Sequence, residues 1–128
     1  MSYYFSKRIK GNFETTLLNT TDALQEEGFG VLTEINVNET LKNKLDVDFP
    51  RYQILGACNP PFAHKALLAE EKIGLMLPCN VIVHEISHGE IEVAAIDPVA
   101  SMQAVDNPKL AEIGQQIREK LKKVIDSL

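Results

Sequence analysis

The sequence of 128 residues contains no tryptophan, and aromatic residues make up only 6% of it. Its two cysteines, Cys58 and Cys79, are too few for the disulfide framework of a small secreted domain. No run approaches the ~20 apolar residues that span a bilayer, and the N-terminal segment MSYYFSKRIKG lacks the apolar stretch of a signal peptide. We therefore expect a cytoplasmic protein with free thiols and without a membrane span.

Positive charge is also scarce, because 13 lysine and arginine residues face 18 aspartate and glutamate residues and give a formal net charge of −5. A protein surface that binds nucleic acid needs an excess of positive charge. The basic residues near the C-terminus are interpreted as solvent-facing residues that complement a helix dipole. We therefore expect no nucleic-acid partner.

The composition that remains is that of an ordinary globular protein, with 45% hydrophobic and 24% charged residues. The length predicts a single domain over residues 1–128. Hydrophobic periodicity, asparagine caps and glycine stops predict the elements in order: strand 3–10, helix 13–27, strand 30–37, short helix 39–45, strand 51–58, helix 60–72, hairpin 80–96 and helix 108–128. This order predicts an α+β fold, a two-layer sandwich with helices packed on one face of a largely antiparallel sheet.

Residues 81–93, VIVHEISHGEIEV, contain the H-E-x-x-H string of zinc metalloproteases, from His84 to His88. That string binds zinc on a helix, where its histidines stand one turn apart. Here the valines and isoleucines and Gly89 predict a hairpin with His88-Gly89 as its two-residue turn. On a strand the two histidines are ~13 Å apart instead of ~6 Å. We therefore interpret the string as a chance match, expect no metal site and disfavour a zinc hydrolase.

The turn at His88-Gly89 predicts a register that pairs His84 with Val93 and Glu85 with Glu92. His84 then faces the core, where we expect it to make one hydrogen bond. The opposite face of the hairpin becomes aliphatic far from the turn, through Val81, Val83, Ala94 and Ile96. An exposed face of this kind predicts an interface, and hence a homodimer with two-fold symmetry. The competing interpretation is that a loop of the same chain, such as residues 97–106, covers it; a lysine at position 83 would distinguish the two.

Three segments of the chain carry a family resemblance. ILGACNPPFAHKAL (residues 54–67), GLMLPCNVIVHE (residues 74–85) and AAIDP (residues 94–98) resemble the motifs of the family called domain of unknown function 302. The resemblance covers nearly the whole chain. It implies a small α+β domain that forms homodimers, and it implies no established activity.

The dipeptides Cys58-Asn59 and Cys79-Asn80 are the candidates for a binding site. Asn59 is expected to cap a helix that leaves a strand directly, and the start of that helix favours a bound anion and a thiolate at Cys58. If the strands that carry the two dipeptides are neighbours, both thiols, both amides and His64 line one pocket. The other interpretation is that the cysteines are small buried hydrophobic residues and the asparagines cap and turn the chain.

Three classes of function follow. The leading hypothesis is a non-catalytic small-ligand-binding or interaction module, with a small anionic ligand and with Cys58, Asn59, His64, Cys79 and Asn80 as candidate ligand-binding residues. The alternative is a thiol-dependent redox or metal-handling protein that uses Cys58 and Cys79, although these lack C-x-x-C spacing. The third, a hydrolase on the H-E-x-x-H string, is disfavoured. No phosphate-binding glycine loop or nucleophile elbow indicates another enzyme or names a cofactor.

Overall fold

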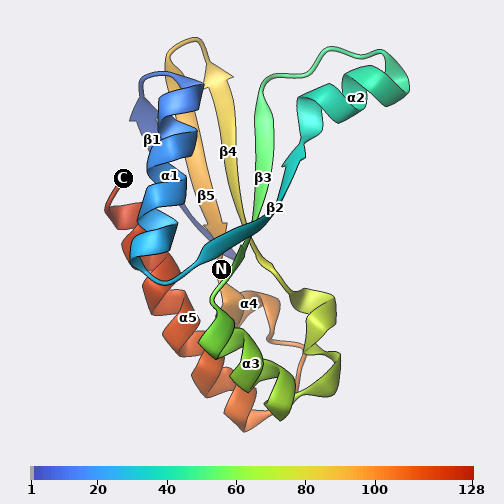
Figure 1. Cartoon of the computed structure of the whole chain (residues 1–128), viewed down its shortest axis with the longest axis vertical. Coiled ribbons are helices and arrows are strands. Elements are labelled where there is room, and N and C mark those ends of the chain that lie inside the picture. The colour runs from blue at the N-terminus through green and yellow to red at the C-terminus, as the bar shows by residue number, and fades with distance from the viewer. Residues whose placement is uncertain (1) are drawn as a thin grey trace.

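The computed structural model describes residues 2–128, in which one antiparallel sheet of five strands has the order β1-β5-β4-β3-β2. The strands are β1 (Tyr4–Lys10), β2 (Gly30–Asn36), β3 (Tyr52–Cys58), β4 (Cys79–Ser87) and β5 (Glu90–Ile96). Helices α1 (Phe13–Glu26) and α5 (Pro108–Asp126) pack on one face of this sheet (Figure 1). The predicted two-layer α+β architecture is confirmed.

The helix starts follow from local chemistry. The side chain of Asn12 accepts a hydrogen bond from the Thr15 N–H at 2.8 Å, and Asn107 accepts one from the Lys109 N–H at 3.1 Å. Each asparagine satisfies a backbone donor that has no partner within its helix. Helix α3 (Pro60–Ala69) ends earlier than predicted, and the 3-10 helix η1 (Glu71–Met76) takes up the following residues.

Two groups of buried side chains hold the fold together. The larger one fills the space between the sheet and helices α1 and α5, with Leu24, Val83, Val93 and Leu121 all at 0% exposure. The smaller one joins α3, η1, α5 and the short helix α4 (Pro98–Ser101) beyond the end of the sheet. The buried residues of this second group are Ala66, Ile73, Met102 and Leu110.

The hairpin has the predicted turn but not the predicted register. His88 and Gly89 form the turn, with Gly89 at a φ of 81°, and Ser87 pairs with Glu90. An irregularity between Glu85 and Ser87 then shifts the pairing, so that His84 lies opposite Glu92. Because side chains alternate along a strand, a shift of one residue turns every side chain of β4 to the other face.

The consequence is that the predicted faces of β4 are exchanged. Val81 and Val83 are fully buried under the helices, whereas Ile82 and His84 are only half-buried on the other face, which we call the open face. The predictions of a core-facing His84 and of an interface at Val81 and Val83 are therefore wrong. A lysine at position 83 would place a charge in the core and would test no interface.

The open face carries an aliphatic row across the sheet. Successive strand pairings place Ala94 beside Ile82, and Ile82 beside Ile54, and they end at Ile35 on β2. Ile35 is 48% exposed. This face therefore combines apolar side chains with access to solvent.

Helix α2 (Val37–Leu45) and the loop after it project from the rest of the molecule (Figure 1). No residue of α2 is buried, and its apolar residue Leu45 is 66% exposed. The loop after the helix adds two exposed apolar residues, Val47 at 42% and Phe49 at 45% exposure. We call residues 37–51 the arm. Over the described part of the chain, every helix is too short or too polar to cross a membrane.

Candidate functional site

A cavity of about 310 Å³ lies where the end of β3 and the start of β4 meet α3 and η1. We call it the thiol pocket. Ala57 on β3 pairs with Cys79 on β4, so the two strands are neighbours, which was the condition for a shared pocket, and both cysteines line the same cavity. Its lining residues are Phe29, Leu32, Ala57, Cys58, Asn59, Ala63, Ala66, Leu67, Gly74, Leu77, Pro78, Cys79 and Ile117.

The two thiols have different surroundings. Both are free, but Cys79 is buried, with 6% of its surface exposed, whereas Cys58 is half-buried. Burial raises the pKa of the Cys79 thiol to about 11, and the neighbouring Cys58 adds to that rise. Because desolvation disfavours the charged form, Cys79 is a neutral thiol at physiological pH.

Asn59 has a structural partner. Its side-chain Nδ2 donates a hydrogen bond to the Glu27 carbonyl oxygen at 3.1 Å, and its side chain makes no cap to α3. It approaches Gly28 so closely that a Cβ on that glycine would lie 3.2 Å from Nδ2. Asn59 therefore ties the end of α1 to the start of α3.

The start of α3 offers few donors to an anion. Pro60 and Pro61 have no N–H, and the Ala63 N–H already donates to the Asn59 carbonyl oxygen at 2.9 Å. In the first turn this leaves the Phe62 N–H. An anion bound at a helix start normally meets several such groups together with the dipole.

The other two candidate residues lie outside the thiol pocket. His64 is exposed on α3 and is absent from the lining. Asn80 follows Cys79 along β4, so its side chain points to the opposite face of the sheet, where it lines a second cavity. The structure thus brings together Cys58, Asn59 and Cys79.

The H-E-x-x-H string lies on β4 and its turn, which confirms the strand interpretation. His84 Nε2 is 2.9 Å from Glu92 Oε1, and Glu92 Oε2 is 3.6 Å from Arg8 Nε. Within residues 2–128, no group of three or more His, Cys, Asp or Glu residues is placed to hold a metal ion. His84 of the string thus pairs with Glu92 across the sheet, and no helix brings the two histidines of the string together.

The comparisons with known proteins address the family. The family model described as "Domain of unknown function DUF302" matches residues 5–128. The chain belongs to the DUF302 family. It is also similar to a solved structure, described as the crystal structure of uncharacterized conserved protein DUF302 from Bacillus stearothermophilus, with 28% identity, 98% of each chain covered and a TM-score of 0.90. No curated protein matches the chain.

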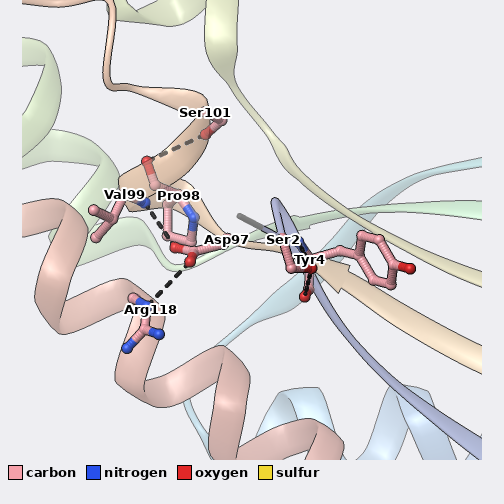
Figure 2. A network of polar contacts seen from close by, with 7 residues as sticks. All are labelled: Ser2, Tyr4, Asp97, Pro98, Val99, Ser101 and Arg118. Carbon is pink, nitrogen blue, oxygen red and sulfur yellow. Dashed lines mark hydrogen bonds and ion pairs between the residues drawn. The ribbon is translucent and has the colours of Figure 1, made fainter.

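The AAIDP motif of this DUF302 chain contains a polar residue that sequence reasoning did not select. Asp97 is 8% exposed; its Oδ1 accepts the Val99 N–H at 3.0 Å, and its Oδ2 accepts the Nε–H of Arg118 at 3.1 Å (Figure 2). Its backbone N–H donates to the Tyr3 carbonyl oxygen at 2.8 Å. Asp97 thus caps α4 and joins β1, β5 and α5. The available signal was Asp97-Pro98, the same cap-and-proline sequence pattern found at the starts of α3 and α5.

Proposed function

We propose that this DUF302 domain is a non-catalytic binding module that takes a small ligand in the thiol pocket. The observation that carries the proposal is an apolar cavity of about 310 Å³ lined by residues of β2, β3, β4, α3, η1 and α5. Small-molecule sites are concave, mostly apolar and about 300–1,000 Å³ in volume. The pocket lies at the small end of this range.

The lining determines the chemistry of the ligand. Apart from the two thiols and the Asn59 amide, its side chains are aliphatic or aromatic. An anionic group of the ligand at the start of α3 would find only the Phe62 N–H as a free backbone donor in the first turn. We therefore infer a ligand that is apolar over most of its surface, with any polar end directed toward the start of α3.

Native mass spectrometry of untagged protein, purified without chelators, tests this proposal. We expect a retained small organic molecule, and we expect added hexanol to shift the amide resonances of residues 57–67 and 77–79. Ala63→Phe fills the pocket and should abolish both effects, whereas Leu68→Phe, on the exposed side of the same helix, should preserve them. A bare mass together with unshifted resonances contradicts the proposal.

The thiol-based alternative keeps one supporting observation, because Cys58 and Cys79 line the same pocket. The raised pKa of Cys79 counts against a second reactive thiolate. Redox or metal chemistry here would depend mainly on the half-buried Cys58. Soft metals bind thiolates, so copper(I) or zinc retained in the native mass spectrum would favour this alternative over the binding module.

We also propose that the domain forms a homodimer with two-fold symmetry. Since β4 turns Val81 and Val83 into the core, the support comes from the other side of the sheet. Edge strand β2 exposes Ile35, and the arm that follows it has exposed apolar side chains and no buried residue in its helix. Uncovered edge strands and large apolar patches are typical of interfaces. We assign the contact with the second copy to this edge and arm.

A further inference from the structure

All three tyrosines of the chain line one cavity of about 350 Å³ on the open face. Tyr3 directly precedes β1 and Tyr4 is its first residue, whereas Tyr52 is the first residue of β3, which is separated from β1 by β5 and β4. The floor is aliphatic. We call this cavity the tyrosine pocket; its other lining residues are Asn80, Ile82, Glu92, Ala94, Ala95 and Ile96, and it shares none with the thiol pocket.

The aromatic rings are arranged as walls. The rings of Tyr3 and Tyr4 have centroids 5.1 Å apart and stand at 74° to each other. The Tyr52 ring packs against the rings of His84 and Phe49, with centroid distances of 5.2 Å and 6.2 Å. The pocket is therefore lined by a T-shaped pair of tyrosine rings and by a third tyrosine from β3.

The polar atoms of the pocket are available to a ligand. Across residues 2–128, the three tyrosine hydroxyls and the Asn80 side-chain amide have no hydrogen-bond partner within the protein. Burial raises the pKa of Tyr52, and Tyr3 and Glu92 add to the rise, so the phenol remains a neutral donor and acceptor. These groups therefore offer hydrogen bonds without first breaking internal ones.

The charge of the lining has one sign. Among the lining residues within positions 2–128, Glu92 is the only charged one, and no lysine or arginine of this described range lines the pocket. His84 and Arg8 hold the Glu92 carboxylate from the side, with Arg8 itself 64% exposed. An anion would find no cationic partner in the pocket, whereas a cation would meet the carboxylate, the phenolic oxygens and the negative faces of the rings.

We infer that the tyrosine pocket binds an organic cation, an alkylammonium or quaternary ammonium with an apolar body. The positive charge lies against the tyrosine rings and Glu92, and the apolar body lies on Ile82, Ala94 and Ile96. Aromatic walls beside a carboxylate are the usual means of binding quaternary ammonium groups. This site is independent of the ligand proposed for the thiol pocket.

The protein reports on this pocket directly. Because it has no tryptophan, its intrinsic fluorescence comes from tyrosine, and every tyrosine lines the pocket. Three probes with one alkyl chain separate charge from apolarity: hexyltrimethylammonium, hexanol and hexanesulfonate. We expect the cation to change the fluorescence at the lowest concentration and the sulfonate at the highest.

Two variants change the negative charge of the pocket in opposite directions and should have opposite effects on the affinity for the cation. Glu92→Gln keeps the shape and should weaken the cation about tenfold, while leaving hexanol unchanged. Asn80→Asp adds a carboxylate to the lining and should tighten the cation; it remains informative if Glu92→Gln folds poorly. Glu119→Gln, at an exposed position on α5 outside both pockets, is the matched control and should change nothing. Three results would each overturn the inference. They are equal affinities for the cation and the sulfonate, an affinity for the cation that changes in neither Glu92→Gln nor Asn80→Asp, and no fluorescence response at millimolar hexyltrimethylammonium.

Discussion

His84 and Glu92 face each other across β4 and β5, with Nε2 of the histidine 2.9 Å from Oε1 of the glutamate. The pair replaces the like-charge contact that the predicted register places between Glu85 and Glu92; Glu85 lies opposite Ile91 instead. A hydrogen-bonded pair of side chains across two strands stabilises the sheet, whereas like charges directly opposite each other destabilise it. The first histidine of the H-E-x-x-H string is therefore explained without a metal.

We expect neither histidine of that string to bind zinc. Exhaustive chelation should leave the unfolding midpoint unchanged, because residues 2–128 contain no group of three or more potential ligands placed to hold a metal ion. His88→Ala should change the free energy of unfolding by less than about 0.5 kcal/mol, as for a surface position. His84→Ala should cost about 1 kcal/mol, because it removes a hydrogen bond to Glu92. Stoichiometric zinc by elemental analysis, lost in His88→Ala, would show that this interpretation is wrong.

The Cys79 thiol should make stability pH-dependent above neutrality. Its pKa rises from 9.0 to about 11 on folding. A group with a raised pKa contributes stability that is present below its unfolded value and is lost as the pH rises through its folded value. Between pH 9 and 11, the wild type should therefore lose about 2 kcal/mol relative to Cys79→Ala. Denaturant unfolding of both proteins across this range measures the difference, and parallel curves would refute the burial argument.

Gly56 should tolerate no side chain. It is buried in β3, and a Cβ there would contact the Thr33 hydroxyl and lie 2.8 Å from Pro78 Cγ. Gly56→Ala should therefore lower the free energy of unfolding by about 2 kcal/mol through overpacking. Gly30 is the matched control, since it also lies in a strand and a Cβ there meets nothing within 4 Å. Equal effects of the two substitutions in urea unfolding would contradict the expected clash.

Asp97→Asn should destabilise the fold without moving the pockets. The substitution removes the charge that pairs with Arg118, and a hydrogen bond between charged groups contributes about 1.5–3 kcal/mol. Asp106→Asn, at an exposed position nearby in the chain, should cost less than about 0.5 kcal/mol. Thermal unfolding of both variants provides the comparison; similar midpoints would show that the pair contributes little.

The arm should mediate assembly. Leu45 is 66% exposed on the arm. Leu45→Lys should give a folded monomer, because it places a charge in the proposed interface. Leu18→Lys is matched in exposure, at 65%, but lies on α1, and should remain dimeric. Light scattering at tens of micromolar distinguishes the two. A monomeric wild type would end the dimer proposal whatever the variants do.

Several features of the fold could be predicted from local sequence because local chemistry decides them. Asn12 and Asn107 cap helices through contacts two or three residues away. Valine and isoleucine around Gly89 make a hairpin, and that alone removes the helical context from the H-E-x-x-H string. The sequence left open whether the strands that carry Cys58 and Cys79 are neighbours, and the pairing of β3 with β4 decided it.

Tertiary structure decided the faces. The irregularity at Ile86 cannot be predicted from the length of the turn. It nevertheless decides which face of β4 is buried, because a register shift of one residue exchanges the two faces of the strand. The same alternation separates Cys79 from Asn80 and places them in different pockets. The tyrosine pocket depends on it as well: Tyr4 and Tyr52 share a face only because β5 and β4 lie between them in a fixed register, and register is a property of the assembled sheet.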